Sequence, residues 1–327
     1  MRAAGADGGV LAGAVALTAN GGNAQRIGES VPDVDGTDGA IRPSVPTPPA
    51  TRPAPPTSLA SIVSELSERD WKILDTVRRH RFATTAQLTT LHFSSITPSA
   101  CASVARRVLA RLRRLGLLDT LTRRVGGVRA GSSGLVHYLS ARGDRLLRHE
   151  HNQRRRRFHE PSQTFLRHTL AVGDIHVALA TAEQRGELEL VAISLEGAAW
   201  RHFHAGLTVA TLKPDAYCEV AVPPESSELL TAFIEVDLGT EHVPTLRRKC
   251  QQYAAYAASS EAADTGMPLV VWSLTARDPA VAEQRRAQLR AAIERDRTLD
   301  SEMFRITSPD QLIAALLTAA RQEGDTP

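Results

Sequence analysis

The stretch Phe233-Ile234-Glu235-Val236-Asp237 gives the first indication of the fold. Side chains of a β-strand alternate between its two faces, so we expect Glu235 and Asp237 on one face and the apolar residues on the other. Two carboxylates on one face repel each other and need solvent, an arginine or a bound cation to compensate them. The stretch therefore predicts a strand that carries an acidic site.

A second acidic stretch, Leu212-Lys213-Pro214-Asp215-Ala216-Tyr217-Cys218, lies upstream. If it forms the neighbouring strand, Asp215 joins Glu235 and Asp237 near one end of a sheet. Magnesium is commonly held by one or two carboxylates together with water and phosphate oxygens. We therefore expect Mg²⁺ as a cofactor, with Asp215, Glu235 and Asp237 as its ligands.

The composition limits the class of protein. The chain has 327 residues, a net charge of +3, 42% hydrophobic and 4% aromatic residues, which predicts about two folded domains. No apolar run reaches the roughly 20 residues of a membrane helix, so we expect a cytoplasmic protein without a membrane partner. Cys101, Cys218 and Cys250 lack the spacing of a disulfide framework or a zinc site and are expected to be buried thiols.

Shifts in composition divide the chain into four parts. Residues 1–57 are rich in Gly, Ala, Pro and Thr and are expected to form a disordered tail. Residues 58–150 carry strong helix signals and many arginines. Residues 151–163 contain four successive arginines and are expected to form an exposed basic linker. Residues 164–325 contain the acidic stretches and form the second expected domain.

The first domain shows three successive helix-start signals. They begin at Ser67, at Thr84 with Gln87, and at Thr97 with Pro98. Gly116 is expected to end the third helix. Two apolar runs, 117–122 and 135–139, follow and are expected to pair as a hairpin. Three helices followed by a hairpin resemble a winged helix-turn-helix domain.

The third helix of this domain carries arginines on most of the surface that it does not use for packing. Clustered arginines are the electrostatic footprint of a polyanion partner, and the third helix of such domains enters the major groove. The residues expected to contact double-stranded DNA are Ser99, Ser103, Arg106, Arg107, Arg111 and Arg114 on the helix and Arg123, Arg124 and Arg129 on the hairpin tip. A solvated arginine-rich helix in a protein-binding domain is the alternative.

The second domain is expected to contain a helix, three strands, a helix and a strand, followed by further helical and strand segments. The expected segments are helix 165–184, strands 188–195, 207–222 and 233–238, helix 243–258, strand 269–274, helix 279–295, strand 304–307 and helix 309–322. A continuous apolar strand after a helical crossover favours a mixed sheet covered on both faces. His168 lies on the apolar stripe of the first helix, where a histidine more often packs than binds a ligand.

This order, with Asp215 on one strand and Glu235 and Asp237 on the next, resembles the PD-(D/E)XK nuclease-like core. The resemblance implies a restriction-endonuclease-like mixed sheet flanked by helices, in an α+β or α/β chain. With the winged helix upstream and Lys249 and Tyr253 downstream, residues 66–275 also resemble the bacterial replication-relaxation family. That resemblance implies plasmid or mobile-element replication and relaxation of DNA, a role compatible with other replication or transfer proteins as partners and with a homodimer.

Carried over position by position, the nuclease resemblance makes Asp215 and Glu235 metal ligands of a magnesium-dependent DNA nickase. Asp237 departs from the pattern, because the lysine of such nucleases belongs there. An acid at this position could be a further ligand, but it removes the cation that would orient the attacking water. Lys249 or Lys213 could replace that cation, and we expect a catalytic set of Asp215, Glu235, Asp237 and Lys249.

Three alternatives stay open. A catalytically inactive DNA-binding initiator or transcriptional regulator would use the nuclease-like domain as a scaffold or dimerisation surface, because fold does not settle activity. A ligand-sensing regulator would have an apolar pocket in place of convergent acids. A tyrosine nucleophile among Tyr217, Tyr253 and Tyr256 is another route to relaxation, although the helical spacing of the last two favours packing.

Overall fold

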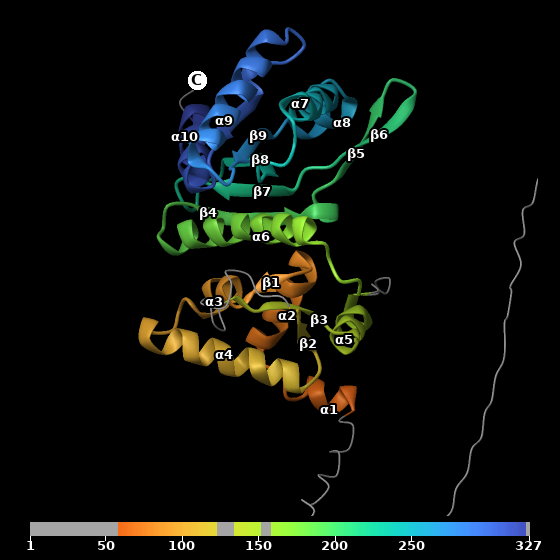
Figure 1. Ribbon diagram of the computed structural model, residues 1–327, viewed down its shortest axis with the longest axis vertical. Helices are drawn as coiled ribbons and strands as arrows, with labels where there is room; N and C mark the ends of the chain where they lie inside the picture. Colours follow the sequence, from red (N-terminus) through yellow and green to blue (C-terminus); the bar gives the residue numbers. More distant parts are fainter. Residues whose placement is uncertain (1–57, 123–133, 152–157, 325–327) are drawn as a thin grey trace, which may run out of the picture. The chain divides into compact units, whose positions relative to one another are not determined.

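The computed structural model describes residues 58–122, 134–151 and 158–324 (Figure 1). The expected tail 1–57, residues 152–157 of the expected linker, and Arg123, Arg124 and Arg129 lie outside the described residues. Within the described residues, no helix is both long enough and apolar enough to cross a membrane.

The first part of the chain combines helices with a small antiparallel sheet. Its elements are α1 (Leu59–Val63), α2 (Glu68–His80), β1 (Ala83–Thr84), α3 (Thr85–Phe93), α4 (Pro98–Arg114), β2 (Leu118–Thr120), β3 (Val136–Leu139) and α5 (Ala141–His151). Strand β3 lies between β1 and β2 and is antiparallel to both. The pairing of β2 with β3 confirms the predicted hairpin.

Two of the three predicted helix caps are confirmed. The Ser67 side chain accepts a hydrogen bond from the N–H of Asp70, and Thr84 forms the predicted capping box with Gln87. The third prediction is only partly right, because helix α4 begins at Pro98 but the Thr97 side chain makes no capping hydrogen bond. Proline at the first helical position has φ fixed near the helical value, which favours the start of the helix at this point.

Gly143 lies where helix α5 passes the end of helix α4. A Cβ atom at this position would overlap the backbone carbonyl oxygen of Leu117. The neighbouring Ser140 hydroxyl accepts a hydrogen bond from the N–H of Gly143 at 3.1 Å, which holds the start of α5 at this distance from the chain. The close approach therefore requires glycine.

Gly143→Ala is expected to lower the free energy of unfolding by about 1–3 kcal/mol, because the clash is with backbone and not with a flexible side chain. Urea denaturation measures the effect. Gly197→Ala is the matched control, since a Cβ there would meet no atom within 4 Å, and it should change stability by less than about 0.5 kcal/mol. Equal effects of the two substitutions would contradict the prediction.

The second part of the chain is built around a five-stranded sheet. Its elements are α6 (Gln163–Gln184), β4 (Glu189–Leu195), η2 (Glu196–Ala198), β5 (Arg201–Ala205), β6 (Thr208–Leu212), β7 (Ala216–Ala221), β8 (Leu229–Asp237), α7 (Val243–Ala257), α8 (Ser260–Thr265), β9 (Leu269–Leu274), α9 (Pro279–Arg295), η3 (Ser301–Met303), β10 (Phe304–Thr307), η4 (Pro309–Gln311) and α10 (Leu312–Gly324). The strand order is β10-β9-β8-β7-β4. Strands β8, β9 and β10 are parallel, and β7 is antiparallel to both of its neighbours. The predicted mixed sheet is confirmed.

Helices cover both faces of this sheet (Figure 1). Helices α6 and α10 pack on the face that carries Ile234 and Val236. Helices α7 and α9 pack on the face that carries Phe233 and Trp272. Strand β8 therefore alternates as predicted, and Glu235 lies on the same side as Phe233.

The expected single strand 207–222 is wrong. The segment forms two strands in two different sheets: β6 pairs with β5 in a hairpin, and β7 joins the five-stranded sheet. The break falls at Lys213–Asp215, where Pro214 has no N–H to donate to a strand ladder. Strand β5 was not expected, because Arg201–Ala205 is a mostly polar run that contains two histidines.

A buried polar cluster joins helices α2 and α3 to helix α6. His80 Nε2 lies 2.9 Å from His176 Nδ1, and both side chains are buried. The Gln87 side-chain amide donates to the Leu170 carbonyl at 2.8 Å and to Asp174 Oδ1 at 2.7 Å. These contacts tie the first part of the chain to the helix that covers the sheet.

The histidine pair in this cluster predicts sensitivity to acid. Burial lowers the pKa of His80 to about 3 and the pKa of His176 to about 4, from an ordinary value of 6.5. The unfolded chain therefore binds more protons than the folded chain below about pH 6.5, and stability is lost as the pH falls toward these values. Each histidine contributes about 1.4 kcal/mol per pH unit in this range.

Denaturant unfolding should show a loss of about 2 kcal/mol for each of these two histidines between pH 6.5 and pH 5. His176→Gln should make the dependence on pH shallower, because it removes one of the two groups. His159→Gln, at an exposed histidine, is the matched control. The prediction is wrong if both substitutions change the pH dependence equally.

Candidate functional site

Asp215 lies immediately before strand β7, beside the end of strand β8. The strands pair through Ala216 and Ile234. Asp215 Oδ2 accepts a hydrogen bond of 2.8 Å from the N–H of Val236, which fixes the carboxylate between the two strand ends. Asp215 therefore lies beside the end of β8, where its charge acts on Glu235.

Glu235 is buried between two side chains of helix α7. Its own side chain is 0% exposed, and Lys249 Nζ lies 2.5 Å from its Oε2 atom. The Tyr253 hydroxyl donates to Oε1 at 2.5 Å. Lys249 and Tyr253 are four residues apart, a spacing that places both on one face of a helix. The two oxygens of Glu235 are thus held by one helix face.

The pKa values in this cluster are displaced in different directions. Burial, with the nearby charge of Asp215, raises the pKa of Glu235 to about 8, although Lys249 opposes the shift. Burial lowers the pKa of Lys249, but the carboxylates Glu235 and Asp215 outweigh it and the net shift is upward. Burial also raises the pKa of the Tyr253 hydroxyl well above its ordinary value. Such displaced values concentrate at functional sites.

His168 reaches the same cluster from helix α6. Its Nε2 atom lies 3.2 Å from the Val236 carbonyl and 3.4 Å from Asp215 Oδ2. The hydrogen bond with Asp215 raises the pKa of His168. Burial tends to raise the pKa of Asp215. The hydrogen bond with His168 and the charge of Lys249 outweigh burial, so the pKa of Asp215 lies below its ordinary value.

His168 was expected to pack on an apolar stripe, yet its side chain is 34% exposed and faces a carboxylate. No spacing in the sequence could have joined it to Asp215, because α6 and the start of β7 belong to distant segments. His168 and Tyr253 are the residues of the cluster that the expected catalytic set left out. Tyr253 was expected to pack, and it is buried in the α7 core as well as bonded to Glu235.

Asp237 lies on the same face as Glu235 but makes separate contacts. Its Oδ1 atom accepts hydrogen bonds from the backbone N–H groups that follow β8, at 3.2 Å from Gly239, 3.2 Å from Thr240 and 3.4 Å from Glu241. Its Oδ2 atom lies 2.6 Å from Arg285 Nη2 on helix α9. Asp237 therefore anchors the turn between β8 and α7.

Of the two candidate lysines, Lys249 is the one at the carboxylates. The Lys213 ammonium lies 4.9 Å from the centre of the Trp200 ring, an arrangement typical of a cation–π contact. The structure thus brings together Asp215, Glu235 and Lys249 of the expected catalytic set.

Few side chains in this cluster could serve as ligands of a magnesium ion. In the part of the chain that the structure describes, no group of three or more His, Cys, Asp and Glu side chains is placed to hold a metal. Asp215 and Glu235 remain as two hard oxygen donors from adjacent strand ends. Mg²⁺ needs no more than one or two carboxylates when water and phosphate oxygens fill the other positions. Two carboxylates are thus the largest set of acidic ligands that this cluster could offer to the ion, and both oxygens of Glu235 already accept hydrogen bonds from Lys249 and Tyr253.

Helix α4 presents most of the expected DNA-contacting residues to solvent. Ser99, Ser103, Arg106, Arg107 and Arg114 are exposed. Arg111 is half-buried, and its Nη2 atom lies 2.5 Å from Asp70 Oδ2. One of the expected arginines is therefore committed to an internal ion pair, and the others form an exposed cationic surface.

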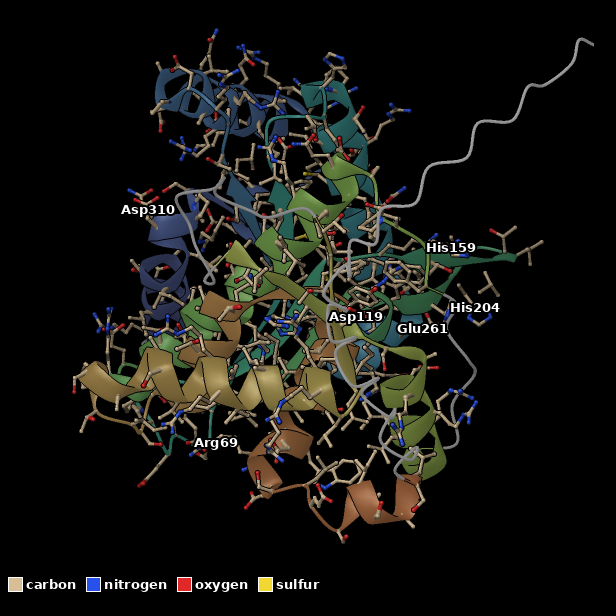
Figure 2. The ribbon with its side chains drawn as sticks, turned by 60° about the horizontal axis from the view of Figure 1, so that its bottom comes forward. Arg69, Asp119, His159, His204, Glu261 and Asp310 are labelled. Carbon is tan, nitrogen blue, oxygen red and sulfur yellow. The ribbon has the colours of Figure 1, made fainter. Side chains whose placement is uncertain are left out.

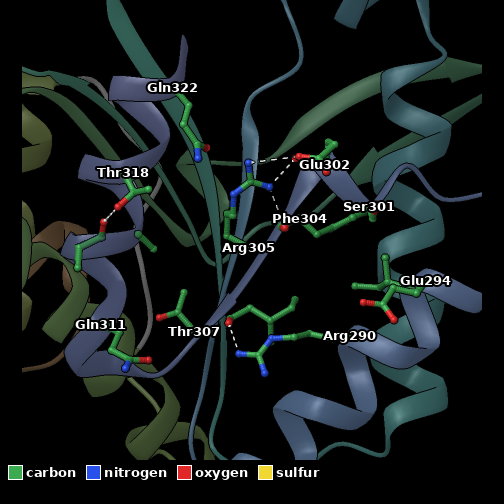
Figure 3. Close-up of a pocket in the computed structure, with 14 residues that line it drawn as sticks. Arg290, Glu294, Ser301, Glu302, Phe304, Arg305, Thr307, Gln311, Thr318 and Gln322 are labelled. Atoms are coloured by element: carbon green, nitrogen blue, oxygen red, sulfur yellow. Dashed lines mark hydrogen bonds and ion pairs between the residues drawn. The ribbon is translucent and has the colours of Figure 1, made fainter. Parts of the chain in front are cut away.

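A pocket lies beside strand β10, between helices α9 and α10 (Figure 3). Its lining mixes charged and polar side chains, such as Arg290, Glu302 and Gln322, with apolar ones. Arg290 donates to the Ile306 carbonyl at 2.8 Å, and Arg305 donates to the Phe304 carbonyl at 3.2 Å. This lining differs from the apolar pocket that a ligand-sensing regulator would require.

Comparisons with known proteins gave one match. The family model described as replication-relaxation matches residues 74–270. The matched segment runs from helix α2 into strand β9 and includes Asp215, Glu235 and Lys249. No curated protein and no solved structure matches the chain.

Proposed function

Because the chain belongs to the replication-relaxation family, we propose that it binds duplex DNA in plasmid or mobile-element replication and nicks it with the help of magnesium. Membership of the family points to a role in replication or relaxation. DNA binding and strand cleavage are the further steps of the proposal. The observation that carries it is the buried Glu235 carboxylate, held by Lys249 and Tyr253 beside Asp215.

The proposed DNA-binding part is a winged helix-turn-helix formed by helices α2 to α4 and strands β1 to β3. Helix α4 would enter the major groove, with Ser99, Ser103, Arg106 and Arg107 near the base edges. Its exposed arginines supply the cationic surface that phosphates require. Because Arg111 is paired with Asp70, it contributes less to this surface than Arg107 or Arg114.

The proposed nicking site belongs to a restriction-endonuclease-like sheet. Asp215 and Glu235 would hold Mg²⁺, which when bound polarises the scissile phosphate and lowers the pKa of a bound water. Lys249 remains charged, because the carboxylates raise its pKa, and it can stabilise negative charge that develops on the phosphate. Tyr253 orients Glu235 by donating to Oε1. Asp237 takes no part in this arrangement, since Arg285 and the turn amides hold it.

One observation favours a second function, a catalytically inactive DNA-binding initiator or regulator. Each carboxylate of the cluster already has a cationic or histidine neighbour: Glu235 has Lys249, Asp215 has His168, and Asp237 has Arg285. This arrangement balances its charges without a metal. In that case the sheet domain would serve as a scaffold or dimerisation surface.

Incubation of supercoiled plasmid with the protein, in Mg²⁺ or in EDTA, separates the two functions. The proposal expects open-circular product only with Mg²⁺, together with duplex binding that weakens steeply as salt is raised. Binding without nicking would leave the inactive initiator. Failure to bind duplex DNA even at low salt would overturn both functions.

A further inference from the structure

The tip of the hairpin formed by strands β5 and β6 carries apolar side chains that are exposed to solvent. Leu207 is 106% exposed and Val209 is 67% exposed. The turn places Gly206 at φ +64° and Leu207 at the second central position. Glycine at the first central position is typical of a type II′ hairpin turn, but the turn itself does not require leucine beside it. The tip thus presents apolar surface that the fold leaves in water.

The stem below this tip is fixed to the rest of the domain. Phe203 and Leu212 are buried in the cluster that contains helix α7. His204 Nδ1 lies 2.6 Å from Glu261 Oε1 on helix α8, and Figure 2 shows these two side chains close together. The Arg201 guanidinium lies 4.5 Å from the centre of the Tyr217 ring. A fixed stem holds the apolar tip in one place.

The charge of the segment favours a polyanion as its partner. Residues 197–214 contain no aspartate or glutamate, whereas they include Arg201, Lys213 and two histidines. After β6 ends at Leu212, the chain passes through Lys213 and Pro214 to Asp215 of the acidic cluster. The base of the hairpin therefore adjoins the proposed nicking site, and the tip lies at the other end of the five-residue strand β6. An apolar tip on a cationic stem suits DNA, where apolar side chains can enter between base pairs while cations contact the phosphates.

We propose that the β5–β6 hairpin is a DNA wedge, in which Leu207, supported by Val209, inserts between neighbouring base pairs of the duplex. The proposal rests on the proposed function, because it requires that the chain engages duplex DNA. Unstacking one base step costs a few kcal/mol and is offset by contacts that the distorted duplex makes with protein. The wedge would locally unwind a duplex that also reaches the base of the hairpin, where the chain leads to Asp215.

Unwinding by the full chain can be measured without cleavage. Closed-circular plasmid is relaxed by a metal-independent type IB topoisomerase in EDTA, with and without the protein, and the linking number is read after the protein is removed. An inserted side chain unwinds the duplex, so the protein should leave the plasmid negatively supercoiled. Binding to the same plasmid is measured in parallel.

Leu207→Ser should reduce the change in linking number at least fivefold while binding changes less than twofold, because helix α4 supplies most of the binding. Leu207→Phe should retain the change, since phenylalanine is also an apolar wedge. Val281→Ser, at another exposed valine, 47% exposed on helix α9, is the matched control and should behave as the unaltered protein.

The outcomes separate this proposal from the proposed function. If the protein binds plasmid but leaves the linking number unchanged, or if Leu207→Ser unwinds normally, the wedge is overturned and the proposed function stands. If the protein does not bind DNA, both are overturned. If Leu207→Ser instead converts a dimer to a monomer in sedimentation and unwinding is unaffected, the tip contacts a second copy of the chain and the wedge is overturned.

Discussion

Asp215→Asn should reduce magnesium-dependent nicking of supercoiled plasmid by about 100-fold or more, with duplex binding within twofold of the unaltered protein. Removal of one preorganised electrostatic group from an active site typically costs 10²–10³ in rate. The amide keeps an oxygen that can accept from the N–H of Val236, so the local backbone contact is retained. The loss would therefore report on the missing charge and not on unfolding.

Glu219→Gln is the matched control for this substitution. Glu219 lies on strand β7, which follows Asp215, and accepts a hydrogen bond from the Tyr217 hydroxyl at 2.9 Å, outside the cluster of Asp215 and Glu235. Rates of nicking should be nearly unchanged in this variant. If Asp215→Asn nicks as fast as the control, cleavage does not occur at the proposed site.

Lys249→Met is expected to destabilise the protein by about 3–5 kcal/mol well above pH 8, where Glu235 is ionised, because removal of one partner of a buried ion pair leaves the other charge without compensation. Glu235 is fully buried, and its second oxygen is held only by the neutral Tyr253 hydroxyl. The cost arises from the stranded carboxylate more than from the lost attraction. Urea denaturation of the folded protein measures it.

The loss should depend on pH, because Glu235 can take up a proton. Burial already raises the pKa of Glu235 to about 8, from an ordinary value of 4.5, and removal of Lys249 removes an effect that lowers it. A group whose folded pKa is raised stabilises the fold below the unfolded pKa, and this contribution is lost as the pH rises through the folded pKa. Lys249→Met should therefore run parallel to the unaltered protein up to about pH 8, because Glu235 is protonated in both, and fall further behind it above pH 8, where Glu235 ionises only in the unaltered protein.

Two further variants test the explanation. Lys213→Met removes an exposed lysine that contacts Trp200 and should cost less than about 1 kcal/mol. The double variant Lys249→Met with Glu235→Gln should recover much of the loss, because it also removes the stranded charge. A loss that is independent of pH, or one that the double variant does not reduce, would contradict the stranded carboxylate as its cause.

The local patterns of the sequence predicted much of the fold. The period-two alternation of residues 233–237 placed Glu235 opposite Ile234, and the burial of Ile234 and Val236 on the α6 side agrees with it. The capping box at Thr84 likewise predicted the start of helix α3. Such patterns succeed because they depend on neighbours a few residues apart, whose geometry is set by the backbone.

The features that the sequence did not predict depend on distant contacts. Arg285 is 48 residues from Asp237, and no pattern within β8 indicates that this arginine takes up the carboxylate. The approach of His168 to Asp215 is equally remote in the chain. The β5–β6 hairpin was missed for another reason, because its polar residues do not form the apolar run by which a buried strand is usually recognised.

Both edge strands of the five-stranded sheet have features that oppose pairing with a strand of another chain. On β10, the guanidinium groups of Arg290 and Arg305 donate hydrogen bonds to backbone carbonyl oxygens of the strand. On β4, the register shifts between Leu190 and Ala192, and the N–H of Leu190 donates to Glu183. Cations and bulges at sheet edges oppose edge-to-edge aggregation. A homodimer of this protein is consequently not expected to form by joining two copies of this five-stranded sheet edge to edge.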